Sequence, residues 1–411
     1  MFYRAGFFPL HAFFLHLKEM RRLSFMLVAG EASGDLLAAE LVRGLKQSPE
    51  LCAMPFPPEF FGAGGPRMAE AGVELAVKLT QYTVIGLSDS LKKYWQFKHI
   101  FDQLFQLATG REPDIIICVD FSWFNHHFAH AIKKHVLARR GAFINWDPKI
   151  VRYVSPQVWA SRPGRARQLE RDVDLLLSIF PFEKEWYARH APGLRVEFVG
   201  HPIVDRYAGR RDELRAKWAS VTPVLLLLPG SRDSELKRHL PVMLAVAQRI
   251  QHHGSVFLRM VLPTDRLAEL AKPKTTCLPR LHVQIGNLSE SLAAATVAIA
   301  STGTVTVECA YFAVPTVAIY KAAWSDYLIA RQIVRVKHLA MPNLLAGEEI
   351  YPEFIQHKAT PDNIARAALE LLNHPERCDA VKARLAQVIK SLGEPGASRR
   401  AAKAVLSLLE M

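Results

Sequence analysis

One pattern, which occurs twice, limits the fold of this chain more than any other feature. In each half a short apolar run, at residues 23–29 and again at 224–228, leads through a glycine-containing turn into a helix-like segment. Apolar runs that alternate with amphipathic helical segments are typical of parallel sheets covered by helices. We therefore expect an α/β protein with two facing Rossmann-like domains, whose ligands bind in an interdomain cleft outside the carboxyl ends of the strands.

The remaining segments extend this pattern. Further strands are predicted at residues 115–119, 175–180, 256–262, 282–285 and 297–300, and helices at 36–46, 128–137, 236–250 and 379–410. The predicted organisation is an N-terminal extension (1–19), a first domain (20–206), a polar linker (207–223), a second domain (224–375) and a C-terminal helical segment that packs back across both domains (376–411).

The first 19 residues contain many apolar side chains, as the core of a signal peptide does. His11 and His16 interrupt them, however, and no cleavage site of small residues follows. We therefore favour an extended or misassigned start, with translation beginning at Met20, over a signal peptide.

Composition narrows the class of protein and its partners. A chain of 411 residues suits two domains, and its net charge of +13 favours an anionic partner. Nucleic acid, acidic lipid and phosphorylated small molecules all fit this charge, but no helix-turn-helix, RRM or zinc pattern that would favour nucleic acid is present. No apolar stretch is long enough to span a membrane. The five scattered cysteines form no C-x-x-C pair, which is typical of a reducing cytoplasm.

The turn after the first strand, residues 30–35, contains Glu31, Ser33 and Gly34. It is not G-x-G-x-x-G, and the carboxylates of Glu31 and Asp35 would repel a phosphate, so the pattern favours a sugar. The alternative is a plain strand-to-helix turn in which Ser33 is the N-cap.

Two turns in the second half suit a nucleotide. Gly230, Ser231 and Arg232 combine free N–H groups at a helix start with a guanidinium, which suits a diphosphate. The alternative is an arginine at the surface. A second turn of the same form contains Ser301, Gly303 and Thr304, and Glu308 follows one helical turn later, where a carboxylate can accept ribose hydroxyls. We therefore interpret the C-terminal half as the nucleotide-binding half.

Asp120 directly follows the apolar run 115–119, where open α/β sheets place functional groups. It can serve as a general base toward an acceptor hydroxyl, or only cap the next helix. His126, His127 and His130 follow, but they lack the glutamate of H-E-x-x-H, so we interpret them as helix-surface histidines and expect no metal site.

The segment 84–107 is aromatic and basic. Apolar and aromatic side chains recur there at helical spacing beside lysines, as on a helix that lies on a membrane surface, and we assign this contact to Val84, Leu87, Leu91, Tyr94 and Trp95. An ordinary amphipathic helix packed on the sheet is the alternative.

Eight segments, in order along the chain, together resemble the lipid-A-disaccharide synthase family. They are VAGEASGD (28–35), FGAGGPRM (61–68), YVSPQVWA (153–160), FPFE (180–183), VGHP (199–202), LPGSR (228–232), STGTVTVE (301–308) and MPNLLAG (341–347). The resemblance covers about residues 27–356.

The resemblance implies a two-domain GT-B glycosyltransferase that inverts the anomeric carbon. It implies transfer of 2,3-diacylglucosamine from UDP to the 6-hydroxyl of 2,3-diacylglucosamine 1-phosphate, with no cofactor or metal. Asp120 matches the proposed base and Arg232 the arginine of the diphosphate turn. Glu308, Asn343 and Gln356 match donor-side positions. On the acceptor side we place Glu31, Ser33, Gly34, Asn125, Ser155, Trp159 and His201.

The same resemblance implies a cytoplasmic enzyme at the inner face of the inner membrane, in contact with an anionic membrane surface and not with nucleic acid. It leaves the oligomeric state open, a homo-oligomer included.

One segment departs from the family pattern. Where the family reads D-A-P-D-F-N, this chain reads DFSWFN, so Trp123 replaces the second aspartate. This leaves Asp120 as the one carboxylate of the segment, and Trp123 is a candidate for the acyl path of the acceptor. The alternatives are a peptidoglycan N-acetylglucosaminyltransferase, a UDP-sugar 2-epimerase, and an inactive membrane-surface binding protein with the same fold.

Overall fold

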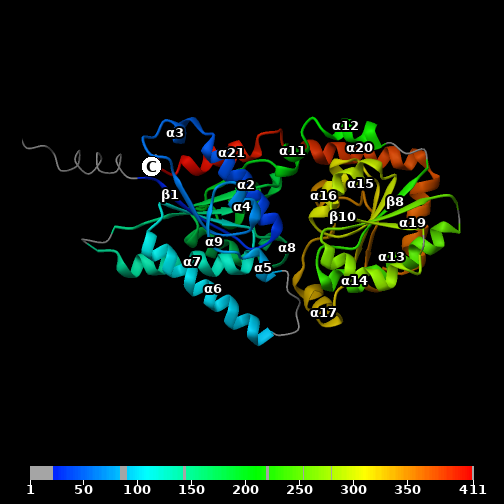
Figure 1. Ribbon diagram of the computed structural model, residues 1–411, viewed down its shortest axis with the longest axis horizontal. Helices are drawn as coiled ribbons and strands as arrows, with labels where there is room; N and C mark the ends of the chain where they lie inside the picture. The colour runs from blue at the N-terminus through cyan, green and yellow to red at the C-terminus, as the bar shows by residue number, and fades with distance from the viewer. Residues whose placement is uncertain are drawn as a thin grey trace, which may run out of the picture.

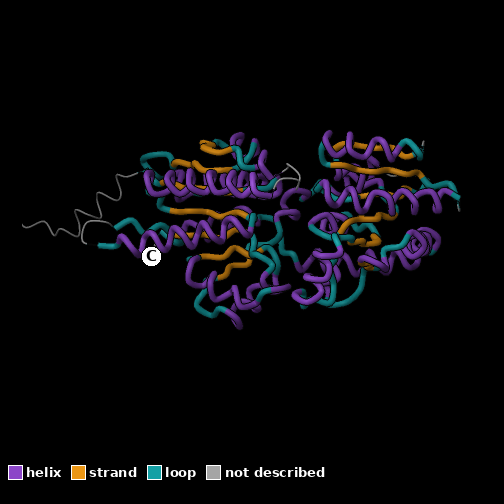
Figure 2. The backbone as a smooth tube through the Cα atoms, turned by 90° about the horizontal axis from the view of Figure 1, so that it is seen from below, coloured by secondary structure: helices purple, strands orange, loops and turns teal. Residues whose placement is uncertain are grey.

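The computed structural model describes residues 22–83, 90–141, 145–218, 222–252, 254–278 and 280–409, with side chains described outside residues 82–94. It contains two parallel sheets, each with helices on both faces (Figure 1). Viewed from below, the strands of each sheet lie between layers of helices (Figure 2). This confirms the predicted fold class, two Rossmann-like α/β domains.

The first sheet has the order β3-β2-β1-β4-β5-β6-β7. Its strands are β1 (Ser24–Ala29), β2 (Glu59–Ala63), β3 (Glu74–Val77), β4 (Ile115–Val119), β5 (Lys149–Tyr153), β6 (Leu175–Ser178) and β7 (Val196–Phe198). The second sheet has the order β10-β9-β8-β11-β12-β13. Its strands are β8 (Val224–Leu228), β9 (Phe257–Leu262), β10 (Leu281–Ile285), β11 (Val297–Ser301), β12 (Thr316–Tyr320) and β13 (Glu353–Ile355).

The direction of strand order reverses once in each sheet. The reversal lies between β1 and β4 in the first sheet and between β8 and β11 in the second. Loops that follow two such strands diverge to opposite faces of the sheet and leave a crevice at their carboxyl ends, which is where open α/β sheets bind ligands. The turns that follow these four strands therefore define where a site can form.

Helices surround both sheets. Those of the first domain are α2 (Ala32–Lys46), α3 (Pro49–Cys52), α4 (Pro66–Glu70), α5 (Thr80–Thr83), α6 (Ser90–Arg111), α7 (Ser122–Arg139), α8 (Val158–Ser161), α9 (Ala166–Asp172), α10 (Pro181–His190) and α11 (Pro202–Tyr207), with the 3₁₀ turn η1 (Pro163–Arg165). The later helices are α12 (Arg211–Trp218), α13 (Asp233–Gln251), α14 (Asp265–Thr275), α15 (Leu288–Ala294), α16 (Thr304–Tyr311), α17 (Trp324–Ile333), α18 (Met341–Ala346), α19 (Pro361–Asn373), α20 (Pro375–Ser391) and α21 (Ala397–Leu406), with the 3₁₀ turn η2 (Gln356–Lys358).

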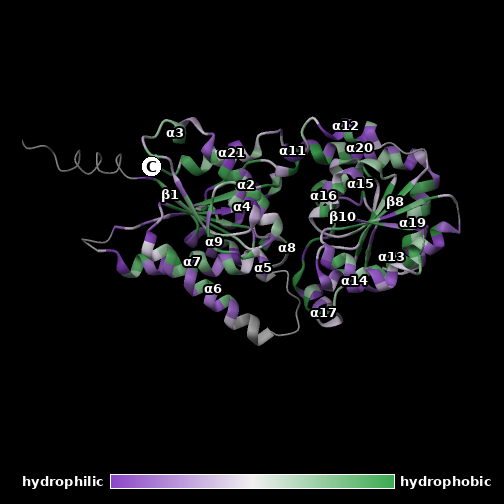
Figure 3. Cartoon of the chain, in the orientation of Figure 1, coloured by the Kyte–Doolittle hydropathy of each residue, from purple (hydrophilic) through white to green (hydrophobic). Residues whose placement is uncertain are grey.

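The central strands are apolar on both faces. In β1, Phe25 and Leu27 pack into one cluster while Met26 and Val28 pack into another, on the opposite face. Strands buried on both sides read as continuous apolar runs, which is why these segments were recognisable in the sequence. Hydropathy mapped on the chain shows the same apolar strands inside (Figure 3).

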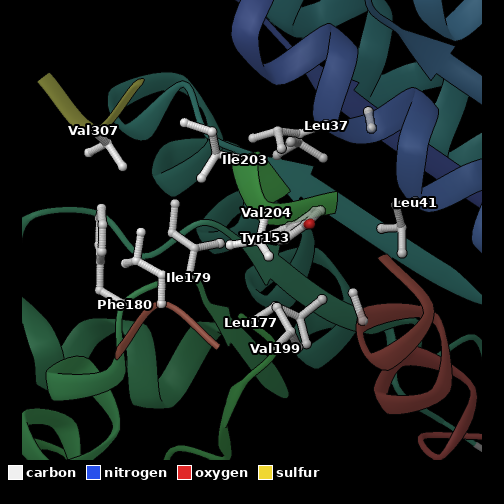
Figure 4. Packing of buried hydrophobic residues seen from close by; sticks show 14 of the residues in the cluster. Leu37, Leu41, Tyr153, Leu177, Ile179, Phe180, Val199, Ile203, Val204 and Val307 are labelled. Atoms are coloured by element: carbon white, nitrogen blue, oxygen red, sulfur yellow. The ribbon is translucent and has the colours of Figure 1, made fainter. Parts of the chain in front are cut away.

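One apolar cluster continues from the first domain into the second. It includes Tyr153 and Leu177 of the first sheet, Ile203 of α11 and Val307 of α16 (Figure 4). The two domains are therefore joined by buried apolar contact as well as by the chain itself.

Two expected elements differ in the structure. The segment 207–223, expected to be a linker, contains helix α12, whose Arg211 and Arg215 donate hydrogen bonds to the backbone oxygens of Tyr311 and Phe312. Its charged residues lie on a surface helix, which a polar composition does not distinguish from a loop.

The C-terminal stretch that was expected to be helical contains two helices. α20 packs on α16, α18 and α19, whereas α21 packs on α2 and α11. Gly393, which follows the end of α20, has φ of 92°, and Gly396, the N-cap residue of α21, has φ of 101°. The expected extension at residues 1–19 lies outside the described residues.

Among the helices that the structure describes, none is long and apolar enough to cross a membrane.

Candidate functional site

The strand ends at the two reversals of strand order meet at the junction of the domains. Nη2 of Arg232, which follows β8, donates to both carboxylate oxygens of Glu31, which follows β1, at 3.2 Å each. The two residues are 201 positions apart in the chain. This contact places the turn after β1 against the turn after β8, so the two crevices form one site.

The turn after β1 differs from the expected turn. Helix α2 begins at Ala32 with Glu31 as its N-cap residue, so Ser33 is inside the first helical turn and the N-cap alternative was wrong. Asp35 is buried and accepts hydrogen bonds from the backbone N–H groups of Gly65, Arg67 and Met68. Its carboxylate therefore anchors the N-terminus of α4, and only Glu31 of the two acids faces the second domain.

Asp120 lies at the carboxyl end of β4 in a strained turn. Asp120 and Phe121 have φ of 45° and 44°, which costs non-glycine residues ~1–3 kcal/mol each. A methyl group on Gly30 would overlap the ring of Phe121, and one on Gly34 would touch the Cβ of Asp120. The two glycines of the first turn therefore let the Asp120 turn approach α2 closely.

Asn125 holds this turn from within the fold. It is fully buried, and its Nδ2 donates to the backbone oxygens of Val28, Val119 and Asp120. The amide thus links β1, β4 and the strained turn. We expected Asn125 beside the acceptor, and the structure places it beneath the site.

Arg152, which no sequence pattern singled out, lies beneath Asp120. It is buried in β5, and one nitrogen donates to Ser122 at 3.2 Å, while its Nε and Nη1 have no hydrogen-bond partner among the described residues. Burial lowers the pKa of Arg152, and the charge of Asp120 acts in the opposite direction. The sequence feature that could have identified Arg152 is its position as a basic residue inside the largely apolar strand KIVRY.

The turn after β8 is an anion cradle that two carboxylates occupy. Gly230 has φ of 122°, and the backbone N–H of Ser231 donates to Glu235 at 3.0 Å. Partial burial tends to lower the pKa of Arg232. The nearby carboxylates of Glu31, Glu235 and Asp120 outweigh this effect, so the pKa of Arg232 is raised. The carboxylate oxygens thus mark a point at which a backbone N–H and a guanidinium converge on anionic oxygens.

The turn after β11 has the expected form. Ser301 is buried at the strand end, Gly303 has φ of 136°, and α16 begins at the exposed Thr304. Glu308, one turn later, is 3.4 Å from the hydroxyl of Tyr207 and 3.6 Å from Arg206. Glu308 therefore lies at the domain junction, where Tyr207 and Arg206 contact its carboxylate. Burial raises the pKa of Glu308.

Asn343 and Gln356, which were expected on the side of the sugar donor, form hydrogen bonds through their side-chain amides inside the second domain. Asn343 is fully buried, donates to Tyr351 O and Glu353, and accepts from the backbone N–H groups of Ile350 and Tyr351. Gln356 binds both backbone groups of Ala322. In this structure both amides support loops rather than open onto the junction.

Ser155 and Trp159 belong to a buried polar cluster next to the junction. Trp159 Nε1 donates to Glu183 at 2.9 Å, Ser178 donates to the same carboxylate, and Ser155 is 3.0 Å from the hydroxyl of Tyr187. Burial raises the pKa of Glu183 to about 7 against the opposing effect of these hydrogen bonds. The cluster fixes the segment that leads into α8.

His201 is a buried helix cap. Its Nδ1 accepts from the backbone N–H of Ile203 and its ring packs on Phe180. Burial lowers the pKa of His201 to about 3, so the ring is neutral near pH 7. Its described contacts are structural.

The expected membrane segment is described only in part. Val84 and Leu87 lie outside the described residues, as do the side chains of Leu91 and Tyr94. Trp95 is 61% exposed, whereas further along α6 Ile100 and Leu104 are buried against the sheet. Trp123 is also exposed, and its ring packs on His127.

The histidines of α7 lie apart from the junction contacts. Nδ1 of His130 is 3.1 Å from Asp172, and His127 bonds the backbone oxygen of Trp123. Within the described residues, no group of three or more His, Cys, Asp or Glu side chains is placed to hold a metal ion.

Comparisons with known proteins agree with the sequence resemblance. The family model described as lipid-A-disaccharide synthetase matches residues 25–408. The lipid-A-disaccharide synthase of Anaeromyxobacter dehalogenans is 36% identical over 393 residues, covering 93% of this chain and 97% of that protein. Lipid-A-disaccharide synthase 2 of Legionella pneumophila is 34% identical over 402 residues, covering 96% and 99%.

Solved structures share the fold at low sequence identity. A UDP-N-acetylglucosamine 2-epimerase from Neisseria meningitidis, bound to UDP-GlcNAc, has a TM-score of 0.62 at 10% identity and covers 94% of this chain and all of its own. MurG of Acinetobacter baumannii has a TM-score of 0.52 at 13% identity, with the same coverage of both chains. These similarities concern the two-domain architecture alone.

Proposed function

Because the chain belongs to the lipid-A-disaccharide synthetase family, we propose that Asp120 and Arg232 act on opposite sides of one displacement at the domain junction. The chain is a glycosyltransferase of lipid A biosynthesis. The family reaction joins UDP-2,3-diacylglucosamine to 2,3-diacylglucosamine 1-phosphate. The acceptor 6-oxygen forms a bond to the anomeric carbon, the bond from that carbon to UDP breaks, and the hydroxyl proton leaves.

Asp120 is the proposed general base. It ends β4 at the reversal of strand order, and a strained turn, Asn125 and the two glycines hold it there. A backbone strain of this kind persists only where surrounding contacts enforce it, and such strain clusters at functional sites. The proton of the acceptor hydroxyl would pass to its carboxylate as the new bond forms.

Arg232 is the proposed partner of the departing diphosphate. Its contact with Glu31 is the observation that carries the proposal, because it brings the Asp120 side and the nucleotide side together. The Ser231 N–H and the Arg232 guanidinium already bind carboxylates, so they have the geometry to bind phosphate oxygens. A fixed cation there would stabilise the charge that develops on UDP, without a metal.

The other residues are assigned by their contacts. Glu308 and the turn with Ser301, Gly303 and Thr304 are proposed to meet the nucleoside. Asn343 and Gln356 are proposed to act indirectly, through the loops that their amides hold. Ser155 and Trp159 are proposed to shape the acceptor side.

The acylated substrates place the enzyme at a membrane. We propose that the protein is cytoplasmic and binds peripherally to the anionic inner face of the inner membrane, with residues 84–95 as one contact. The exposed Trp95, with the Lys98 ammonium 5.3 Å above its ring, supports this.

A turnover assay with both acylated substrates in EDTA tests the proposal. Disaccharide and UDP should form in equal amounts without added metal. Asp120→Ala should lower turnover by roughly 10²–10⁴-fold while UDP binding persists. Near-normal turnover of that variant would exclude Asp120 as the base.

Arg232→Ala should weaken both UDP binding and turnover, and Arg67→Ala, which removes an exposed arginine of α4, is the control. UDP binding with no disaccharide in the unmodified protein would favour the inactive binding protein. Conversion of UDP-N-acetylglucosamine would instead favour the epimerase.

A further inference from the structure

Helix α17 in the second domain exposes an apolar surface that nothing in the proposed reaction uses. Trp324, Leu328 and Ile329 are 61%, 54% and 58% exposed, and Val334 directly after the helix is exposed as well. None of the ten residues of α17, all of which the structure describes, is buried. Large apolar side chains exposed together mark an interaction surface.

Basic residues surround this apolar surface. Residues 321–337 contain Lys321, Arg331, Arg335 and Lys337, against one acid, Asp326. Arg331, Arg335 and Lys337 are exposed, and within the described part of the chain none of the three is in an ion pair. Tryptophan with aliphatic side chains and an excess of lysine and arginine is the composition of a helix that lies on an anionic lipid surface.

The position of α17 adds a second argument. The backbone N–H of Arg335 donates to the oxygen of Ala160 in α8 at 2.8 Å, so the segment after α17 touches the first domain beside Trp159. α17 and the start of α6 are both at the lower border of the molecule in Figure 1, one from each domain. The two helices that carry the exposed Trp95 and Trp324 therefore lie on the same side of the molecule in this view.

We propose that α17 docks the second domain on an anionic bilayer, so that the protein contacts the membrane through both domains. The apolar face of Trp324, Leu328 and Ile329 inserts at the level of the headgroups, and Arg331, Arg335 and Lys337 contact acidic lipid. This extends the proposed membrane contact from the first domain to the second, and its test requires neither turnover nor substrate.

The experiment measures binding of the full chain to vesicles of phosphatidylcholine and phosphatidylglycerol at 3:1. The variant Trp324→Ser/Leu328→Ser/Ile329→Ser should bind at least about tenfold more weakly. A matched control, Phe56→Ser/Leu137→Ser/Phe257→Ser, removes three other apolar side chains that are between 40% and 70% exposed and should bind as the unmodified protein does. Arg331→Ala/Arg335→Ala/Lys337→Ala should bind more weakly and depend less on salt.

Direct contact has its own readout. Vesicles of brominated lipid should quench the tryptophan fluorescence of the unmodified protein more than that of Trp324→Phe. Equal vesicle binding by the α17 variant and its control would overturn the proposal. So would a variant that binds vesicles normally but changes the sedimentation mass, which would assign the face to a second copy of the chain.

A variant with normal vesicle binding and a raised KM for dispersed acylated donor would also overturn it, because the face would then bind the acyl chains of the substrate. UDP binding and the thermal midpoint of each variant establish that it is folded. If the unmodified protein binds vesicles but forms no disaccharide, the proposed function fails while this inference stands.

Discussion

At the scale of single residues, the most informative contact is the one in which carboxylates fill the anion cradle. Glu31 and Glu235 occupy the donors that we assign to the diphosphate. A diphosphate that binds there must displace Glu31 from Arg232, because both cannot use the same guanidinium edge. Under the proposed function the first turn would have two roles, to face the acceptor and to hold Arg232 before the donor arrives.

Glu31→Gln should therefore bind UDP more tightly. Both side chains are substantially exposed, so the lost competition is worth no more than ~1 kcal/mol, or about a two- to fivefold decrease in Kd. Isothermal titration measures this. Glu70→Gln, which removes an exposed partner of Arg67, is the control and should leave Kd unchanged. An unchanged or weaker affinity in Glu31→Gln would mean that Glu31 does not compete with the diphosphate.

Glu183 gives a pH prediction. Burial raises its pKa from 4.5 to about 7, so the folded protein binds a proton that the unfolded chain releases. The stability from this group is fully present below pH 4.5 and is lost as pH rises through 7, to a total of ~3 kcal/mol. The free energy of unfolding of the unmodified protein, relative to Glu183→Gln, should therefore fall between pH 5 and pH 8.

Urea unfolding at several pH values measures the difference. The comparison with Glu183→Gln isolates this carboxyl from His201, whose lowered pKa acts in the opposite direction at acidic pH. A difference between the two proteins that does not change with pH would contradict the assignment.

At the scale of elements, the strained turn after β4 depends on the helix that follows it. Asn125 in the first turns of α7 reaches back to three backbone oxygens, so the helix and the turn hold each other. Asn125→Ala removes the buried amide donor from these oxygens and should destabilise the protein by ~2–4 kcal/mol. Turnover should fall as Asp120 loses its position, while the Kd for UDP stays the same.

Unfolding in urea and single-turnover kinetics check this. Gln103→Ala, on the exposed face of α6, is the control for loss of a side-chain amide. Asn125→Asp keeps the size but removes the donor, so it should resemble Asn125→Ala. Retention of full stability by either variant would refute the role of Asn125 in holding the turn.

The predictable elements were those whose local pattern matches their burial. The runs at 115–119 and 224–228 were predicted at their observed bounds, because a strand buried on both faces is apolar at every position. Helix α2 begins four residues before the predicted start, because its first turn consists of turn-like residues whose contacts lie elsewhere in the fold. Asp35 is an example, since it binds residues 30 or more positions away.

Site residues could be predicted from the sequence where they follow a predicted strand. They could not be predicted where contacts with distant parts of the chain determine their role. Asp120 was selected because it directly follows a predicted strand, and Arg232 because it lies in the glycine-containing turn between a predicted strand and a helix. Arg152, Glu235 and Arg206 were missed, since their importance lies in partners that no local pattern shows. Asn125 and Asn343 were assigned to ligands, but a buried amide and an exposed one look the same in a sequence.

At the scale of the whole molecule, the domains are joined by polar contacts at several points. Arg206 on α11 is 3.6 Å from Glu40 on α2 and 3.6 Å from Glu308 on α16, so one guanidinium bridges the two domains. α21 returns to the first domain, where Asp205 accepts hydrogen bonds from the backbone N–H groups of Gly396 and Ser398. The segment 205–206 therefore contacts both domains and the returning C-terminal helix.

Arg206→Met should weaken this coupling in a pH-dependent manner. Burial already raises the pKa of Glu40 and of Glu308, and Arg206 opposes that shift in both. Without Arg206, two largely buried carboxylates have lost their cation, so the protein should lose ~2 kcal/mol of stability at pH 8. At pH 5 the loss should be smaller, since protonation removes the buried charges.

Calorimetry distinguishes this coupling from a general loss of stability. In the unmodified protein the unfolding transitions of the two domains should overlap. In Arg206→Met at pH 8 the overlap should decrease, so that the overall transition broadens or splits. Arg249→Met is the control, because it breaks an exposed pair with Asp362 that contributes little. If Arg206→Met unfolds as the control does at both pH values, apolar contact between α11 and α16 is sufficient to join the domains, and the guanidinium bridge is not required.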